Sequence, residues 1–302
     1  MRPILLSVLC VASLWAGPAR AQEAEAPRAD TLRAADGWRS SLEVALAGNQ
    51  SATSNWQEGG VDALAVTATA EGAFDRVVGR VLTTQALRLG FGVVRQDTLS
   101  LRKALDVARY AVTAELASDD PLRPSAGLSV RSQFAAGYDY DPDPGRYPTL
   151  AVVPGQELKV SDALSPLVLT QSLGVAYRPG GGLVVRTGLG LKETVVLIER
   201  LRPVYGNALD QAARLEAGLD LEALYEREVM DNVALRSRLT VFQGFGQIAE
   251  RAPDALFENG LILTVNDLLR VTLDAAALYD ADVSSRVQLR EALSVGLAVT
   301  LL

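Results

Sequence analysis

The stretch "RLEAGLDLEALY", Arg214 to Tyr225, decides the fold because its apolar and polar residues alternate one by one. One set of positions is apolar throughout: Leu215, Ala217, Leu219, Leu221, Ala223 and Tyr225. The other set holds four charges and a glycine: Arg214, Glu216, Gly218, Asp220 and Glu222. Successive side chains of a strand point to opposite faces, so this pattern predicts a β-strand between an apolar and a polar environment. Ala, Leu and Glu also favour an amphipathic helix, but a helix would set Asp220 among the leucines.

The same alternation recurs along the chain, for example over residues 269–279 and 293–301. It predicts twelve strands, at about residues 39–48, 60–73, 82–93, 102–117, 124–138, 165–178, 182–194, 211–225, 232–245, 254–265, 268–279 and 286–301. Many of them exceed the five or six residues that are typical of globular strands. Their lengths match the roughly 9–11 residues that a tilted strand needs to cross a bilayer.

The links between these strands are short and long in approximate alternation. Short links include "RPGGG" at 178–182 and "ND" at 266–267, whereas the segments 139–164 and 198–211 are long. Short periplasmic turns and longer outer loops are typical of outer-membrane barrels. We therefore predict an all-β fold, an up-and-down antiparallel transmembrane β-barrel of about twelve strands. A water-soluble β-sandwich also alternates, but it does not need strands of this length.

Pairing within one predicted hairpin can be specified further. If the strands at 211–225 and 232–245 pair about a turn centred near Val229, Glu222 lies opposite Arg236 and Asp220 lies opposite Arg238. Opposite charges that face each other across two strands stabilise their pairing. This register is therefore the predicted one.

The N-terminus predicts export from the cytoplasm. Met1-Arg2 is followed by an apolar run from Ile4 to Trp15 and by the small-x-small triplet Ala19-Arg20-Ala21. These are the parts of a secretory signal peptide. We expect a signal peptide over 1–21, a flexible leader over 22–37 and a barrel over 38–302 in the bacterial outer membrane. Cys10 would suit a lipoprotein site, but Ser7-Val8-Leu9 lacks the small residues that such a site needs.

Composition excludes several classes of function. The chain has no histidine, a single cysteine and a formal net charge of −7. The missing histidine removes Ser-His catalysis and His-ligated metals, and the acidic balance argues against nucleic acid as a partner. We predict no enzymatic activity, cofactor or metal. Remote alternatives are an enzyme using the paired carboxylates of Glu216, Asp220 and Glu222, and calcium binding by "DPDPG" at 141–145.

Charged residues are concentrated on the face of the strands that we expect to line the lumen. The predicted lumen charges are Arg131, Arg186, Lys192, Arg214, Glu216, Asp220, Glu222, Arg236, Arg238, Arg270 and Asp274. Rings of charge inside a barrel tune ion passage, so these residues would suit a pore or a solute site. The interpretation that we favour for the charges themselves is a salt-bridged plug of side chains that fills a modest lumen and stabilises the barrel.

Four short motifs resemble a known family. "SNWQEGG" (Ser54 to Gly60) resembles the S-N-W-x-x-G-G motif of the DUF3078 family, and "SQFAAGYDY" (132–140) resembles its Q-F-x-x-G-Y-x-Y segment. "DNVALRSRLTVF" (231–242) and "LYDADV" (278–283) are similar to its later segments. The resemblance implies a secreted bacterial outer-membrane β-barrel, in a family whose function is not established. It singles out the loop residues Ser54, Asn55, Trp56, Gly59 and Gly60.

The two tryptophans outside the predicted signal peptide bear on the position of the membrane. Trp38 and Trp56 stand at opposite ends of the first strand, where indoles would mark the two membrane interfaces. Alternatively, residues 54–56 fold back into the barrel mouth.

We expect a porin-like or solute-transport channel whose partners are outer-membrane lipid, the barrel-assembly machinery during biogenesis and a small solute. The alternative is a non-conducting structural or docking barrel.

Overall fold

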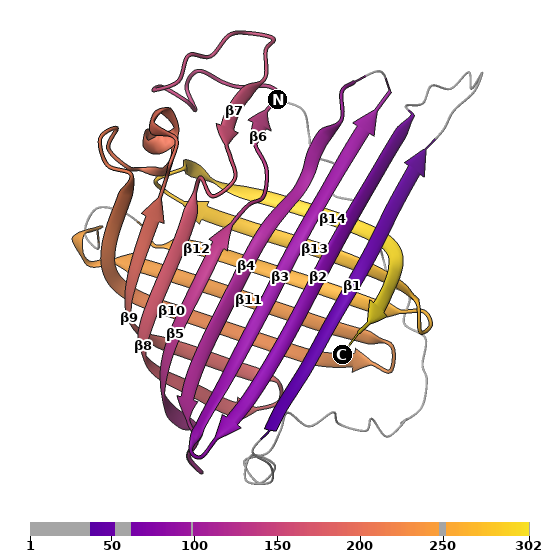
Figure 1. Ribbon diagram of the computed structural model, residues 1–302, viewed down its shortest axis with the longest axis vertical. Helices are drawn as coiled ribbons and strands as arrows, with labels where there is room; N and C mark the ends of the chain where they lie inside the picture. The colour runs from indigo at the N-terminus through magenta and orange to yellow at the C-terminus, as the bar shows by residue number, and fades with distance from the viewer. Residues whose placement is uncertain (1–36, 52–61, 98, 248–251, 302) are drawn as a thin grey trace.

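The chain folds into a closed β-barrel. The computed structural model describes residues 37–51, 62–97, 99–247 and 252–301. Twelve strands pair antiparallel with their neighbours, and the last pairs with the first, so the sheet closes on itself (Figure 1). Closure satisfies the hydrogen bonds of every strand edge. The predicted up-and-down antiparallel barrel of about twelve strands is therefore confirmed.

The barrel strands follow the chain in order around the ring. They are β1 (Gly37–Ser51), β2 (Ala63–Val78), β3 (Val81–Gln96), β4 (Arg102–Leu116), β5 (Leu122–Ser132), β8 (Leu167–Gly180), β9 (Leu183–Val195), β10 (Ala213–Met230), β11 (Val233–Gly244), β12 (Asp254–Thr264), β13 (Leu269–Asp280) and β14 (Ser284–Thr300).

The alternating pattern sends the large apolar side chains outward. Leu173, Leu189 and Leu293 are 70%, 62% and 64% exposed in the middle of β8, β9 and β14. The alternate positions of the same strands face the lumen, where the charged residues meet one another. The outer surface is consequently apolar and the interior polar, the reverse of a water-soluble barrel. Among the described residues, no helix is long and apolar enough to cross a membrane.

The two ends of the barrel differ in the length of their links (Figure 1). One end, here called the short-turn end, has tight links such as residues 79–80, 181–182 and 231–232. Gly181 and Gly182 adopt positive φ of 63° and 82°, and a Cβ on Gly182 would lie 1.9 Å from the Glu226 carbonyl oxygen. Glycine is therefore required in this turn.

The other end, the long-loop end, carries elements that the strand prediction did not include. The predicted strand over 124–138 ends at Ser132, and β6 (Gly137–Asp139) pairs with β7 (Leu158–Ser161) as a separate two-stranded sheet. A 3-10 helix, η1 (Glu199–Tyr205), lies in the β9–β10 link, and η2 (Phe245–Gln247) follows β11. The β13–β14 link of residues 281–283 is short, so the alternation of link lengths breaks there.

The register predicted for β10 and β11 is wrong. Glu222 lies opposite Thr240, whereas Arg236 lies opposite Glu226. Asp220 lies opposite Phe242 rather than Arg238. The physical reason is that β10 continues to Met230, so the turn falls at residues 231–232 and not near Val229. Glu222 and Arg236 nevertheless share the lumen face.

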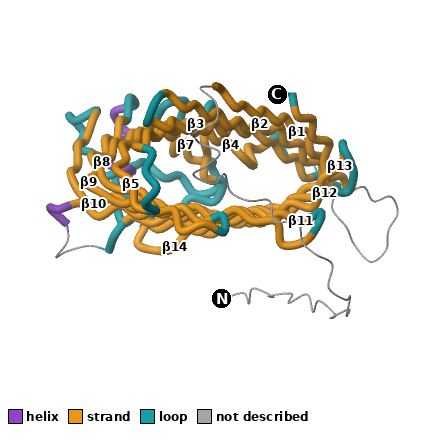
Figure 2. The backbone as a smooth tube through the Cα atoms, turned by 90° about the horizontal axis from the view of Figure 1, so that it is seen from below, coloured by secondary structure: helices purple, strands orange, loops and turns teal. Residues whose placement is uncertain are grey.

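Seen from one end, the barrel has a flattened outline (Figure 2). β2, β3 and β4 form one long side, and β11, β12 and β14 form the other. Flattening shortens the distance between these opposite walls. Side chains on one of these walls can therefore reach the other wall.

Several predictions fall on residues outside the described ranges. They concern the signal peptide over 1–21, the leader, and the loop motif of Ser54, Asn55, Trp56, Gly59 and Gly60. Trp38 is described: it lies opposite Arg76 on β2 at the short-turn end, with the guanidinium 5.2 Å from the ring centroid. Its side chain is 56% exposed, as an interfacial indole would be.

Candidate functional site: a charged lumen

A row of three arginines crosses three neighbouring strands on one long wall. Arg88 on β3 lies opposite Arg109 on β4, and Arg109 lies opposite Arg131 on β5. Beyond Arg88 the row continues as Glu71 on β2 and Glu43 on β1. Side chains directly opposite each other on adjacent strands share a face, so this row, here the arginine row, points as a unit into the lumen.

Ion pairs join the arginine row to the opposite wall. Arg109 makes two hydrogen bonds to Glu258 on β12, of 2.6 and 3.2 Å, although β4 and β12 are six positions apart in the ring of twelve. Arg88 reaches Asp274 on β13 at 3.4 Å. These pairs span the lumen from wall to wall.

A third pair crosses the lumen in the opposite direction. Arg236 on β11 binds Glu71 on β2 at 3.1 Å, and Glu226 beside it on β10 at 2.9 Å. Arg88 also lies 3.5 Å from Glu71. The three wall-to-wall pairs, Arg88–Asp274, Arg109–Glu258 and Arg236–Glu71, are called the cross-lumen pairs below.

Nearer the short-turn end, one buried carboxylate holds two arginines. The Glu115 side chain is 1% exposed and accepts hydrogen bonds from Arg178 at 2.6 and 2.8 Å and from Arg186 at 3.0 and 3.1 Å. Arg186 also binds Glu222 at 3.0 Å, and Arg238 lies 3.7 Å from the same carboxylate. Charge-assisted bonds of this kind compensate the cost of removing a carboxylate from water.

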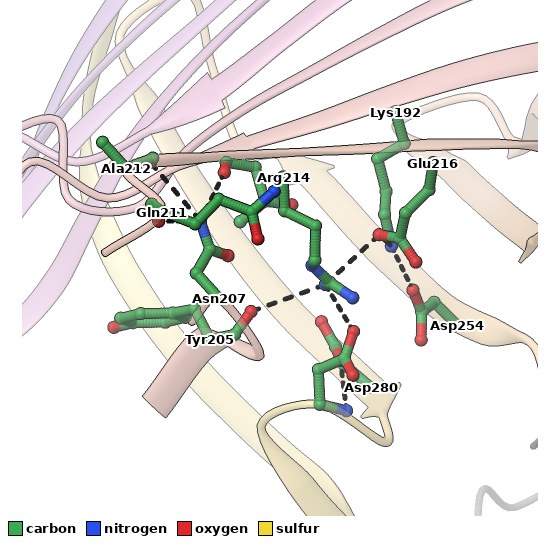
Figure 3. A network of polar contacts seen from close by, with 11 residues as sticks. Lys192, Tyr205, Asn207, Gln211, Ala212, Arg214, Glu216, Asp254 and Asp280 are labelled. Carbon is green, nitrogen blue, oxygen red and sulfur yellow. Dashed lines mark hydrogen bonds and ion pairs between the residues drawn. The ribbon is translucent and has the colours of Figure 1, made fainter. Parts of the chain in front are cut away.

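Toward the long-loop end, a second network links β9, β10, β12 and β13 (Figure 3). Lys192 binds Asp254 at 2.5 Å and Glu216 at 3.2 Å, and its ammonium lies 4.9 Å from the Phe242 ring centroid. Arg214 contacts Glu216 at 3.2 Å.

Arg214 also connects this network to the loops. Its guanidinium lies 2.5 Å from Asp282. It also lies 3.4 Å from the Tyr205 carbonyl oxygen at the end of η1 (Figure 3). Asn207 donates to the carbonyl oxygens of Thr194, Gln211 and Ala212 at 2.9, 3.3 and 3.3 Å. The loop after β9 is thus fixed to the rim of the barrel by polar contacts.

The long loop between β5 and β8 is fixed in the same way. Asp106 on β4 accepts the backbone N–H groups of Phe134 and Ala135 and pairs with Lys103 at 2.7 Å. The Tyr205 hydroxyl donates to the Val160 carbonyl oxygen at 3.0 Å, and burial raises the pKa of this phenol. Lys159 holds the pKa of the Asp162 carboxyl below its usual value by a hydrogen bond.

The structure places the eleven predicted lumen charges as follows. Nine take part in ion pairs inside the barrel: Arg186, Lys192, Arg214, Glu216, Glu222, Arg236, Arg238, Arg270 (with Glu43) and Asp274. Asp220 lies on the same face of β10 as Glu216 and Glu222. Arg131 ends the arginine row, and no ion pair joins it to another residue in the described ranges.

Several lumen residues were missing from the prediction. They are Glu43, Glu71, Arg88, Arg109, Glu115, Arg123, Arg178, Glu226, Asp254, Glu258 and Asp282. Arg88 illustrates the signal that could have found them: it is an isolated charge among Thr84, Ala86, Gly90 and Gly92 on the small-residue face of its strand. A lone charge on such a face lines a lumen in a barrel whose outer face is apolar.

The lumen is lined by opposed charges that pair with one another. Most acids in the lumen are neutralised by a cation, and the described residues contain no group of three or more acids, cysteines or histidines placed to hold a metal.

Comparisons with curated sequences and solved structures find at most distant similarity. A search of curated protein sequences gives no match. Among solved structures, the COG4313 outer membrane channel from Pseudomonas putida F1 is similar, with 11% identity, a TM-score of 0.40 and coverage of 87% of this chain and 95% of that one. The translocator domain of the autotransporter NalP from Neisseria meningitidis has 12% identity, a TM-score of 0.32 and coverage of 90% and 91%. Values this low assign no activity to this chain.

The sequence comparison with protein families concerns the first third of the barrel. Residues 48–138 match the model of DUF3078, described as a protein of unknown function. This segment contains the motif "SNWQEGG" and most of "SQFAAGYDY", whereas the two later motifs lie outside it. The resemblance of this chain to the DUF3078 family is thereby confirmed over residues 48–138.

Proposed function

We propose that this protein is a transmembrane β-barrel of the bacterial outer membrane that serves as a narrow, gated channel for small polar solutes, closed in the conformation described here. The observation that carries the proposal is the set of cross-lumen pairs. They join opposite walls with side chains alone, so the barrel can open without rearranging its strands.

The membrane location is supported by the outer surface. Leucines and valines point outward on strands around the ring, as at Leu46, Leu173, Leu219 and Val295, which are 56%, 70%, 49% and 47% exposed. A continuous apolar exterior would aggregate in water, because monomeric soluble proteins rarely expose apolar patches above a few hundred Å². In a bilayer the same surface is stabilised by lipid, and a closed sheet leaves no unpaired backbone group in the hydrocarbon.

A channel is favoured over an inert barrel by the kind of residues that fill the lumen. Burying ion pairs stabilises a fold little, because desolvation offsets the attraction, and apolar side chains of similar volume fill an interior at least as well. The lumen nevertheless holds charged residues along its length, from Glu115 to Arg214. Such an interior suits a water-containing path.

The cross-lumen pairs also favour the second candidate, a non-conducting structural or docking barrel. Arg109 and Glu258 have side chains that are only 12% and 16% exposed, so this pair fills the space between the walls. If such closure is permanent, the long loops become the functional surface. The two candidates differ in what happens when the pairs are removed.

Conductance in planar lipid bilayers separates the candidates. We expect the unmodified barrel to be closed for most of the recording, with brief discrete openings. The double variant Arg109→Gln, Glu258→Gln keeps a polar side chain at both positions and removes the charge attraction, so its open fraction should rise about tenfold or more. The control Arg227→Gln changes an exposed arginine on β10 and should leave the openings unchanged.

Two outcomes count against the channel. If neither the unmodified barrel nor the double variant conducts after repeated reconstitution of heat-modifiable protein, the structural barrel is the better account. Recovery of the protein only from the soluble periplasm would overturn the membrane location as well.

A further inference from the structure

We propose that Arg123, Arg178 and Arg186 form a binding site for a small oxyanion, such as a phosphate or carboxylate group, at the short-turn end of the lumen. Such a site goes beyond conduction. It would exist in a closed barrel as well as in a channel, and it is tested by binding rather than by current.

The first observation is a buried cation without a counter-charge. Arg123 is 7% exposed, and its Nε has no hydrogen-bond partner. Within the described ranges, no hydrogen bond or ion pair reaches its guanidinium. The nearby Asp120 makes no ion pair with it; the Asp120 carboxylate accepts the backbone N–H of Leu122 at 3.0 Å. Buried charges in proteins are almost always paired, so an unpaired one indicates a missing partner.

The second observation is the convergence of cations from three adjacent strands. Arg123 on β5 lies opposite Ala176 on β8, and Arg178 is two residues further along the same face of β8. The Arg178 backbone N–H donates to the Pro121 carbonyl oxygen at 2.9 Å, which holds this part of β8 beside the start of β5. Arg186 on β9 faces Ala176 across the next ladder. The three guanidinium-bearing positions therefore surround Ala176.

The third observation is that the local carboxylate is already saturated. Glu115 accepts four hydrogen bonds from Arg178 and Arg186. It lies opposite Ser125, two residues from Arg123 on β5. Arg178 and Arg186 therefore share Glu115 without Arg123, and a second carboxylate, Glu222, is reached by Arg186 and Arg238. The cluster retains a net positive charge.

These features select an oxyanion. A guanidinium presents its N–H groups in a planar fork that matches the geometry of carboxylate and phosphate oxygens. Arg178 is 26% exposed in its side chain and lies close to the Gly180–Gly182 turn, so the cluster is reached from the short-turn end. A small anion seated against Arg123 would satisfy its Nε and balance the surplus charge.

Isothermal titration of the folded barrel in detergent with sodium phosphate tests the site, against sodium chloride at matched ionic strength. We expect one saturable phosphate site in the unmodified protein. Arg123→Met keeps the apolar stem and should weaken binding by roughly tenfold or more, since it removes a charge-assisted contact. Arg227→Met, the same change at an exposed position of β10, should leave the affinity unchanged.

Folding is controlled in each sample by heat-modifiable migration. If Arg123→Met does not fold, Arg123→Lys keeps the charge without the fork and should bind phosphate more weakly than the unmodified protein. Absence of saturable binding to the unmodified protein overturns the proposal, because the cluster is then merely hydrated. Full affinity in a folded Arg123 variant overturns it too. Neither result alters the conductance experiment, so the two proposals fail separately.

Discussion

Glu115 shows how much a single carboxylate contributes to the stability of a lumen lined with arginines. Its oxygens are the common acceptors for Arg178 and Arg186, and its side chain is 1% exposed. Replacement by glutamine keeps the volume but removes the carboxylate that Arg178 and Arg186 share, and Arg186 then retains Glu222 as its acidic partner. We expect Glu115→Gln to lower the free energy of unfolding by about 3–5 kcal/mol.

Urea unfolding of the barrel in phospholipid vesicles measures this loss. The matched control is Glu228→Gln, an exposed position near the β10–β11 turn, where we expect a change within about 0.5 kcal/mol. Equal effects at the two positions would show that Glu115 does not organise its neighbours.

Residue types in the lumen were easier to predict than residue partners. The alternation in "RLEAGLDLEALY" places Glu216 and Glu222 on one face whatever the rest of the barrel does. The partner of Glu258 could not be predicted, because Arg109 is 149 residues away and meets it only when the ring closes and flattens. Arg123 was missed because its lack of a partner is visible only once every neighbour is placed.

At the scale of the strands, the period of two was sufficient to locate all twelve barrel strands, with ends that differ from the structure by up to six residues. Local geometry was less predictable. β6 and β7 are too short to show a period, and β5 ends at Ser132 although apolar residues continue to Tyr138. The β10–β11 register was wrong because the exposed end of β10, Glu226–Met230, has polar residues on both faces and so carries no alternation.

The observed β10–β11 register is open to a cross-linking test. Residues directly opposite each other on antiparallel strands have Cβ atoms about 4.5–5.5 Å apart, close to the range that a disulfide spans. In a background in which Cys10 is replaced by serine, the pair Glu226→Cys, Arg236→Cys should oxidise to a disulfide, as measured by loss of free thiol. The pair Glu222→Cys, Arg236→Cys, four residues out of register, should remain reduced. The reverse result would restore the register that was predicted from the charges.

For the whole molecule, the apolar exterior gives a depth-dependent prediction. Leu189 is 62% exposed near the middle of β9, and Val229 is 48% exposed at the short-turn end of β10. Arginine on the lipid face costs about 2–4 kcal/mol at the bilayer midplane and about 0–1 kcal/mol near the interfaces. We therefore expect Leu189→Arg to lower the free energy of unfolding by about 2–4 kcal/mol and Val229→Arg to change it little.

The measurement is again urea unfolding in vesicles, with the same pair of variants compared in detergent micelles. Surface substitutions in a water-soluble protein usually change stability by no more than about 0.5 kcal/mol. Small, equal effects for Leu189→Arg and Val229→Arg in vesicles would therefore show that the exterior does not face a bilayer.

The arginine row has a consequence for anything that enters the lumen. Arg88, Arg109 and Arg131 stand side by side on β3, β4 and β5, while Asp274 and Glu258 stand on the wall facing them. Where the pairs Arg88–Asp274 and Arg109–Glu258 part, their charges produce an electric field directed across the passage, perpendicular to the direction of travel. The pair of Arg236 on β11 and Glu71 on β2 carries the opposite signs and limits this field to the part of the lumen between β3–β5 and β12–β13. A solute with its own dipole, such as an amino acid in its zwitterionic form, would be turned with its carboxylate toward β3–β5 and its ammonium toward β12–β13. In the proposed channel, solutes would then be sorted by orientation as well as by size.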